Sequence, residues 1–321
     1  MQAKTKPRVI ALEEHYWDAE VATHFDGTEA RAPKLRAKLG DLEKLRLKEM
    51  DEGGIDVQVI SHGAPGMQHI EAASAVPLAK RANDRLAAAV ARHPDRLAAF
   101  AAIPVNDPKA AADELERTVT RLGFKGAMVH GLTKEGLFFD DKRFWPIFER
   151  ARKLDVPLYL HPAAPSPAVV NAYYKDYIED FPNLATSAWG YTVETATQTI
   201  RLVLSGVFEA YPGLKIIIGH MGESIPFSLW RISQSLSRGG NKPNAFRDTF
   251  CEHFWITTSG NFSTPALLCS ILEMGADRIL FSVDWPFVDN PPGTDWMKQV
   301  PLGKEDLAKI YGENAARLLK L

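Results

Sequence analysis

Four apolar segments of the sequence end abruptly in ionisable residues of the kinds that bind metals. They are ALEEH at 11–15, PLYLHP at 157–162, KIIIGHMGE at 215–223 and ILFSVDWP at 279–286. A single such residue at a strand end usually opens a solvated loop. Four at equivalent positions indicate a shared site, because a buried charge without a partner is costly. Histidine, glutamate and aspartate together suit one divalent metal, Zn²⁺ or Mn²⁺, better than the all-oxygen ligands of Ca²⁺.

The alternation of a β-strand separates the ionisable residues of the first segment. Successive side chains point to opposite faces, so Glu13 and His15 share one face, and Glu14 shares the other with Ile10 and Leu12. The face of a barrel strand that packs against helices favours Ile and Leu, which leaves Glu13 and His15 facing the axis. Glu13 and His15 are therefore the candidate pair, and Glu14 is expected to be a structural or rim carboxylate.

The segments that carry these residues alternate with helical ones. Eight β-rich runs, most of them followed by a segment of helical periodicity, predict a (β/α)₈ TIM barrel of the metal-dependent hydrolase type, with a doubly wound open sheet as the alternative. In a barrel, the carboxyl ends of all strands meet at one mouth. The predicted strands are residues 9–12, 56–61, 97–104, 126–131, 157–161, 214–220, 255–259 and 279–284, and the predicted helices are 41–54, 108–123, 141–154, 193–211, 224–236, 265–274 and 304–319.

Two of the connections are too long to be simple turns. About 20 residues follow the first strand and about 30 follow the fifth, and loops of that size are usually lids or binding loops. Both follow the carboxyl ends of strands, the face that carries catalysis in barrels. No repeat, low-complexity tract or linker interrupts the sequence, so residues 1–321 are expected to form a single domain.

Composition excludes several classes of function. The 321 residues are 45% hydrophobic, and 38 Lys and Arg against 40 Asp and Glu give a net charge of −2. Without a basic stripe, nucleic acid is not an expected partner. The apolar run behind MQAKTKPR is far too short for a signal peptide or a membrane span, which predicts a soluble, cytoplasmic protein without a membrane partner. Cys251 and Cys269 lack metal-type spacing and are expected to be inert.

The sequence resembles the metal-dependent decarboxylases of the amidohydrolase superfamily, such as the γ-resorcylate (2,6-dihydroxybenzoate) decarboxylases and related hydroxybenzoate decarboxylases. The resemblance covers nearly the whole chain. It lies in ALEEH (11–15), GIDVQVIS (54–61) with APGMQ (64–68), FWPIFERARKLDVPLYLHP (144–162), GHMGESIPFSLWRI (219–232) and FSVDWPF (281–287). This combination is highly specific for the family.

The resemblance implies roles for the matching residues. His220 would be the catalytic histidine, oriented by Glu223, which is within reach if the chain turns into a helix at Met221. Arg231 would lie near the substrate. The fourth strand has no lysine at its carboxyl end to bridge two metals, so one metal per chain is expected. Four residues would bind that metal: Glu13, His15, His161 and Asp284.

These roles predict a reaction. The metal would chelate a substrate carboxylate together with an ortho hydroxyl. As the resemblance implies, Asp284 would protonate the ring carbon that bears the carboxylate, and His220 would handle the phenolic proton or assist in charge stabilisation. The predicted activity is non-oxidative decarboxylation of a hydroxyaromatic acid, a carbon–carbon lyase reaction. The alternatives are a mononuclear hydrolase or hydratase of a lactone, amide or activated ring compound, and a barrel that only binds a small molecule.

The expected substrate is a small aromatic acid held between apolar walls. Phe25, Trp189 and Phe287 are candidates for those walls. His62 and His130 follow strand ends at the mouth and depart from the family, in which Asn usually replaces His130 and a smaller or uncharged residue replaces His62. Both are therefore candidate substrate contacts. The family tends to form dimers and tetramers, so the resemblance also implies a homodimer or homotetramer.

Overall fold

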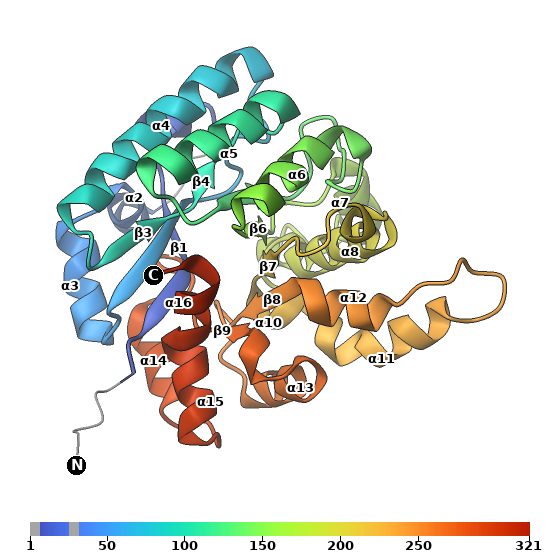
Figure 1. The fold of residues 1–321 in the computed structure, drawn as a ribbon. Helices are drawn as coiled ribbons and strands as arrows, with labels where there is room; N and C mark the ends of the chain where they lie inside the picture. Colours follow the sequence, from blue (N-terminus) through green and yellow to red (C-terminus); the bar gives the residue numbers. More distant parts are fainter. Residues whose placement is uncertain (1–6, 26–31) are drawn as a thin grey trace.

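The computed structural model describes residues 7–25 and 32–321, in which strands and helices alternate around a common centre (Figure 1). All hydrogen-bonded strand neighbours run parallel. The strands are β1 (Ile10–Tyr16), β2 (Val57–His62), β3 (Leu97–Ala99), β4 (Ala101–Ala102), β5 (Ala127–His130), β6 (Leu158–His161), β7 (Ile216–Ile218), β8 (Phe254–Thr257) and β9 (Ile279–Leu280).

The predicted third strand, 97–104, is divided into β3 and β4. β3 pairs with β2, and β4 pairs with β5. Between them, the Phe100 N–H donates to the carbonyl of Ile60, so the chain passes from one neighbour to the other without leaving the sheet layer. The two strands therefore occupy one position of the barrel.

The order of the strands identifies the fold. Neighbours follow one another in chain order, from β1 to β3 and from β4 to β9. A doubly wound sheet reverses its order at a switch point, and the described strands contain no such reversal. The chain beyond β9 also lies against β1, where the His15 N–H donates to the carbonyl of Trp285 at 2.6 Å. The predicted barrel is confirmed, and the open sheet is not the fold.

Helices surround the strands (Figure 1), and no helix in residues 7–25 and 32–321 is long and apolar enough to cross a membrane. They are α1 (Ala19–Ala22), α2 (Pro33–Gly40), α3 (Lys44–Gly53), α4 (Ala72–Arg92), α5 (Pro108–Leu122), α6 (Trp145–Leu154), α7 (Pro167–Tyr173), α8 (Gly190–Leu204), α9 (Val207–Ala210), α10 (His220–Glu223), α11 (Ile225–Leu236), α12 (Phe246–His253), α13 (Thr264–Met274), α14 (Asn290–Met297), α15 (Lys304–Ala308) and α16 (Asn314–Leu319).

Several helices differ from the prediction. The longest, α4, was not predicted, because its buried face consists mainly of alanines, which give a weak apolar signal. The predicted helix 193–211 begins earlier, at Gly190, and divides into α8 and α9 at Gly206, whose φ of 86° no right-handed helix accommodates. The two long connections contain α1 and α2 after β1, and α7 after β6.

The interior of the barrel forms one apolar cluster. It includes Ile10 and Leu12 of β1, Tyr159 of β6 and Leu280 of β9, and it is joined by Leu318 of α16. A larger cluster of buried residues fills the layer between the strands and the helices. The cluster to which a strand residue belongs therefore shows whether its side chain points into the barrel or toward the helices.

β1 corrects the predicted orientation of its first residues. Ile10 and Leu12 belong to the barrel interior, although they were predicted to face the helices. The pairing with β2 changes register between Ala11 and Glu14, where β1 contains one more residue than its partner. Such a bulge reverses the alternation beyond it. Glu13 and the residues that follow therefore take the faces that were predicted, but for a different reason.

Glu14 fastens the chain after β9 to β1 from the outer side. Its carboxylate is completely buried. Oε1 accepts hydrogen bonds from the Ser282 hydroxyl and the Val283 N–H, both at 3.0 Å, and Oε2 accepts from the Trp285 N–H at 3.1 Å and from Gln58 Nε2 at 3.3 Å. Of the two roles predicted for Glu14, the structural one fits this position, because a rim residue would be solvated.

Replacing Glu14 by Gln is expected to destabilise the fold. The amide would set an N–H group against donors that now converge on a carboxylate, which costs about 1–3 kcal/mol. Urea denaturation followed by circular dichroism would measure this loss. Glu52→Gln is the control, because Glu52 is exposed and forms a helical surface pair with Lys48. Equal midpoints for the two variants would contradict the proposed role of Glu14.

Candidate metal centre

Four side chains from distant parts of the sequence meet at the carboxyl ends of the strands. Their ligand atoms all lie within 4.8 Å of one another. His15 Nε2 is 3.2 Å from Asp284 Oδ1, and His161 Nε2 is 3.1 Å from Glu13 Oε1. These are the four residues to which the resemblance assigns metal binding, and the structure brings all of them together.

The unpaired atoms of this cluster test whether a cation fits. Glu13 Oε1, His15 Nε2 and Asp284 Oδ1 are buried, and none makes a hydrogen bond within residues 7–25 and 32–321. The close approach of His15 to Asp284 lacks hydrogen-bond geometry, although its length would allow an ion pair. Buried polar atoms nearly always have a partner. Two carboxylate oxygens and two imidazole nitrogens around one point supply suitable ligands for Mn²⁺ or Zn²⁺.

The two histidines are oriented through their other ring nitrogens. His15 Nδ1 lies 3.3 Å from the hydroxyl of Ser61. His161 Nδ1 lies 2.7 Å from the carbonyl of Pro162 and 3.0 Å from His130 Nδ1. These contacts direct both Nε2 atoms toward the cluster, as in metal sites whose ligands are held by a surrounding layer of hydrogen bonds.

Burial and mutual charge determine the protonation of the cluster. Burial lowers the pKa of His15 to about 4, against the attraction of Glu13, so the ring is neutral near pH 7 and able to bind a metal. Burial alone would raise the pKa of Glu13, but His220 and His161 outweigh it and hold that pKa well below its usual range. Burial and the charge of Glu13 raise the pKa of Asp284 to about 7. The two carboxylates therefore repel each other, and a cation would relieve that repulsion.

His220 and Glu223 form the predicted pair, but the backbone conformation that brings them together was not predicted. His220 Nδ1 lies 2.7 Å from Glu223 Oε1, and His220 Nε2 is 3.5 Å from Glu13 Oε1. Burial alone would lower the pKa of His220, but Glu13 and Glu223 raise it to about 10. Thr192 donates to the second oxygen of Glu223 at 2.8 Å. The pair therefore presents one imidazole nitrogen to the cluster.

Glu223 was expected to reach His220 if the chain turned into a helix at Met221, but the turn found there is not an ordinary right-handed helix. Residues 220–224 all have positive φ, between 50° and 73°. Such a left-handed turn costs roughly 1–2 kcal/mol for each residue other than glycine. A left-handed turn brings residues three apart together, as a right-handed helix does. The contact between His220 and Glu223 was therefore predicted, but the handedness of the turn was not.

His62 and His130 use their ring nitrogens within the protein. His62 Nε2 accepts from the Asp18 N–H at 3.1 Å, and its Nδ1 lies 2.9 Å from the carbonyl of Gly63. His130 Nε2 lies 2.8 Å from the carbonyl of His62, and its Nδ1 faces His161. Both side chains are buried. Both side chains therefore have partners within the protein, and their contact with a substrate stays a prediction.

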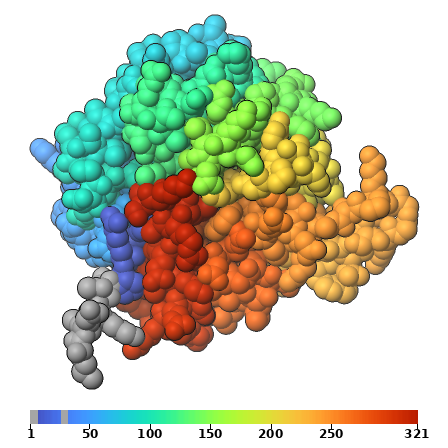
Figure 2. Space-filling view, viewed as in Figure 1, coloured from blue at the N-terminus to red at the C-terminus, as the bar shows by residue number. Residues whose placement is uncertain are grey.

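The other predicted substrate residues lie at different depths. The Phe287 ring is 5.7 Å from the His15 ring and 41% exposed, so it forms a wall beside the cluster. Phe25 is buried against His62. Trp189 is 49% exposed just before α8. Arg231 is exposed on α11, which projects from the barrel together with α12 (Figures 1 and 2).

Three hydroxyl residues beside Glu13 were not predicted. Tyr159, Thr257 and Ser259 all contact Glu13 Oε2. Strand alternation could have found them, because Tyr159 lies two residues before His161, and Thr257 and Ser259 share one face of β8 and its extension. Neutral hydroxyls within apolar runs carry less weight in a sequence than charged residues do.

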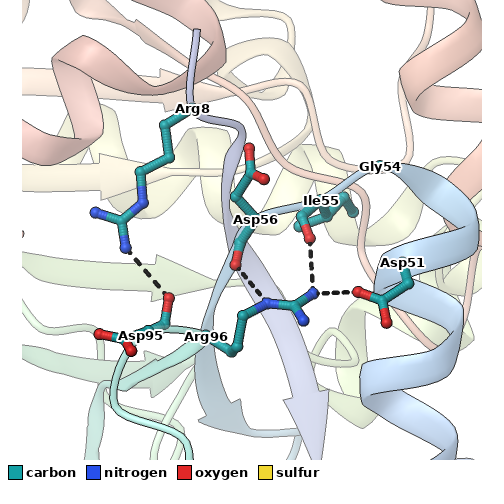
Figure 3. A pocket seen from close by; sticks show the side chains of 7 residues that line it. All are labelled: Arg8, Asp51, Gly54, Ile55, Asp56, Asp95 and Arg96. Carbon is teal, nitrogen blue, oxygen red and sulfur yellow. Dashed lines mark hydrogen bonds and ion pairs between the residues drawn. The ribbon is translucent and has the colours of Figure 1, made fainter. Parts of the chain in front are cut away.

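A cavity at the opposite end of the strands is not a competing site. Its volume is about 680 Å³, and it opens beside the residues that precede β1, β2 and β3 (Figure 3). Arg96 donates to Asp51 and to the carbonyls of Ile55 and Asp56, and Arg8 donates to the carbonyl of Asp95. The guanidinium groups that line this cavity are therefore paired with groups of the protein, whereas the cluster of Glu13, His15, His161 and Asp284 contains unpaired ligand atoms.

Comparison with known proteins agrees with this geometry. The family described as Amidohydrolase matches residues 14–321. The chain belongs to this family. A gamma-resorcylate decarboxylase of Polaromonas sp. (strain JS666 / ATCC BAA-500) is 42% identical to this amidohydrolase over 325 residues, which cover 97% of this chain and 98% of that protein.

Solved structures extend the similarity to three dimensions. A 2,6-dihydroxybenzoate decarboxylase complexed with 2,6-dihydroxybenzoate has a TM-score of 0.90 at 41% identity, covering 98% of this amidohydrolase and 100% of that chain. A dihydroxybenzoic acid decarboxylase from Polaromonas sp. JS666, with bound manganese and the inhibitor 2-nitroresorcinol, has a TM-score of 0.91 at 41% identity, covering 98% of each chain. The resemblance seen in the sequence is confirmed.

Neighbouring carboxylates of β1 should respond differently to substitution. Glu13→Gln replaces a charged member of the cluster and is expected to lower the metal content of the purified protein at least about tenfold. Glu14→Gln is the comparison, because Glu14 lies on the outer face and reaches the cluster only through the backbone around Asp284, so the metal content should fall much less. Mass spectrometry of the metal in equal amounts of folded protein would compare them. Equal losses in both variants would contradict the assignment of Glu13.

Proposed function

We propose that this amidohydrolase is a metal-dependent, non-oxidative decarboxylase of a hydroxyaromatic carboxylic acid, and thus a carboxy-lyase. The observation that carries the proposal is the buried cluster of Glu13, His15, His161 and Asp284 with three unpaired ligand atoms beside His220. Similarity over nearly the full chain to gamma-resorcylate decarboxylases supports the reaction type. The conclusion therefore has both a geometric and a comparative basis.

Glu13, His15, His161 and Asp284 are the proposed ligands of one divalent metal. Manganese in the solved relative supports Mn²⁺, while Zn²⁺ remains compatible with the same ligands. When bound, the metal supplies a Lewis acid that polarises the carboxylate and the ortho hydroxyl of the substrate. Phe287 borders the cluster and offers its ring as an apolar wall for the planar acid.

The proposed chemistry is assigned to two residues of the chain. The Asp284 side chain is 16% exposed, whereas the Glu13 side chain is fully buried. The second carboxylate oxygen of Asp284 can therefore reach a substrate ring in the mouth of the barrel. Asp284 delivers a proton to the ring carbon that bears the carboxylate, the carbon–carbon bond breaks, and CO₂ leaves as aromaticity returns. His220, held by Glu223, stabilises the phenolic oxygen from the side of Glu13.

Gly260 lies between the two residues proposed to act on the substrate. The position that a Cβ of Gly260 would occupy is 3.6 Å from both Asp284 Oδ2 and His220 Cδ2. The proposed proton donor and the proposed catalytic histidine therefore border the same glycine. This juxtaposition supports their action on one substrate.

Incubation of the manganese-loaded protein with a panel of hydroxybenzoates tests the proposal. We expect CO₂ release, with 2,6-dihydroxybenzoate as the first acid to examine. Asp284→Asn should lower kcat by about 10²–10⁴-fold, the usual contribution of a general acid. Cleavage of ester or lactone probes, without CO₂ release from any acid of the panel, would favour a hydrolase and overturn the decarboxylase assignment.

We infer that the chain forms one domain that works in the cytoplasm. Ile10 from its first strand and Leu318 from its last helix pack in the same interior cluster, which supports a single domain. Cys251 and Cys269 are both free thiols, which suits a reducing compartment.

A homodimer or homotetramer is the proposed assembly, and α11 is the proposed contact. Phe227 and Trp230 on this helix are 85% and 67% exposed. Large aromatic side chains are enriched in protein interfaces. The projection of α11 and α12 from the barrel leaves this surface accessible to a second copy (Figure 2). Arg231 also lies on α11, and this position does not by itself support the role in substrate binding that the resemblance implies.

Trp230→Asp is expected to shift the protein from an oligomer to a monomer, because it places a charge in an apolar contact. Light scattering coupled to size-exclusion chromatography would give the mass of each species. Tyr173→Asp is the matched control, since Tyr173 is 68% exposed on α7, away from α11. An unchanged oligomer in the Trp230 variant, or a monomeric wild type, would contradict the assignment of α11.

A further inference from the structure

The two oxygens of Glu13 have different surroundings. Oε1 faces the metal cluster, 3.1 Å from His161 Nε2 and 3.5 Å from His220 Nε2. Oε2 points the other way, where it accepts hydrogen bonds from the hydroxyls of Tyr159 and Ser259. The carboxylate is thus divided between a side for the metal and a side for the protein.

A third hydroxyl completes the surroundings of Oε2. Thr257 Oγ1 lies 3.3 Å from Oε2, 2.9 Å from the Tyr159 hydroxyl and 2.7 Å from Ser259 Oγ. All four side chains are buried within the barrel. Tyr159 and Ser259 each donate a hydrogen bond to Oε2, and Thr257 donates to Oε2 or to one of the other two hydroxyls. We call these three residues the hydroxyl cradle.

The backbone is shaped to let the carboxylate reach the hydroxyl cradle. A Cβ added to Gly219 would lie 2.6 Å from Glu13 Oε2 and 3.1 Å from Ser259 Oγ, so a larger residue would displace one of them. Ser259 Oγ also accepts from the His220 N–H at 3.1 Å. The Ser259 hydroxyl therefore connects Glu13 to the start of the left-handed turn.

We propose that Tyr159, Thr257 and Ser259 are positioning residues that restrict Glu13 to binding the metal through Oε1 alone. Their hydrogen bonds to an ionised oxygen are of the strong, charge-assisted kind. Holding Oε2 fixes the rotation of the carboxylate, so that Oε1 stays directed at the cluster before any metal arrives. The proposal rests on the proposed metal centre and extends it to residues that touch neither metal nor substrate.

Tyr159→Phe tests the hydroxyl cradle by removing one donor and little else. We expect the Kd for Mn²⁺ to rise about 10–100-fold, the usual effect of losing a group that orients a metal ligand. Electron paramagnetic resonance measures this Kd from the free-ion signal. The spectrum of the bound ion should also change, because a released Oε2 can rotate toward the metal. A residue that only stabilised the fold would leave that spectrum unaltered.

Tyr16→Phe is the matched control. Tyr16 is 2% exposed, and its hydroxyl has no hydrogen-bond partner in the described part of the chain. Its Mn²⁺ affinity should stay close to that of the wild type. Thr257→Val and Thr257→Ser form a second pair, in which only serine keeps the hydroxyl and should restore tight binding. Thermal melting of the metal-free variants would show whether each has folded.

Two failures can be told apart. A wild-type protein that binds neither Mn²⁺ nor Zn²⁺ would overturn the metal centre itself. Tight binding by the wild type, with Kd values for Tyr159→Phe and Thr257→Val that match the Tyr16→Phe control, would overturn only the hydroxyl cradle. Weak binding by both variants and recovery with Thr257→Ser would support it.

Discussion

The structure depends on the interactions that stabilise two consecutive buried carboxylates, Glu13 and Glu14. Glu13 and Glu14 are both completely buried, and they lie on opposite faces of β1. A buried carboxylate needs donors or a cation to offset the loss of hydration. Glu14 obtains hydrogen bonds from the chain after β9, while Glu13 obtains the hydroxyl cradle on one oxygen and the metal cluster on the other. One strand thus joins the closure of the barrel to the construction of its site.

The outer carboxylate also supports the inner cluster. Arg46 of α3 is fully buried, donates to Gln58 and to the carbonyl of His15, and stacks on the Trp285 ring at 4.1 Å. Glu14 accepts from the Trp285 N–H. Because Trp285 follows Asp284 directly, this network holds the backbone of two proposed ligands at once. The positions of those ligands are therefore a property of the barrel closure and not of a flexible loop.

The sequence predicted well what depends on residue type and poorly what depends on backbone detail. The alternation of β-rich and helical segments predicted the barrel, and the ionisable residues at strand ends predicted a shared site at its mouth. The family resemblance then selected Glu13, His15, His161 and Asp284 as the metal ligands. The bulge in β1 could not be predicted, because neither Leu12 nor Glu13 differs in type from a residue of a regular strand. The inward position of Glu13 was correct only because the bulge offset a reversed assignment of Ile10. Where the backbone leaves the regular alternation, pattern alone is insufficient.

The internal hydrogen-bond partners of His62 and His130 could not be predicted from the sequence pattern either. A histidine at a strand end was expected to face the substrate, yet what decides its role is the partner of each ring nitrogen. His130 connects the carbonyl of His62 to His161, and so supports a proposed ligand from behind. The mouth of the barrel therefore contains polar residues of two kinds. Those with every ring nitrogen paired maintain the geometry, and those with unpaired atoms, Glu13, His15 and Asp284, converge on the one place where a divalent cation would satisfy all of them.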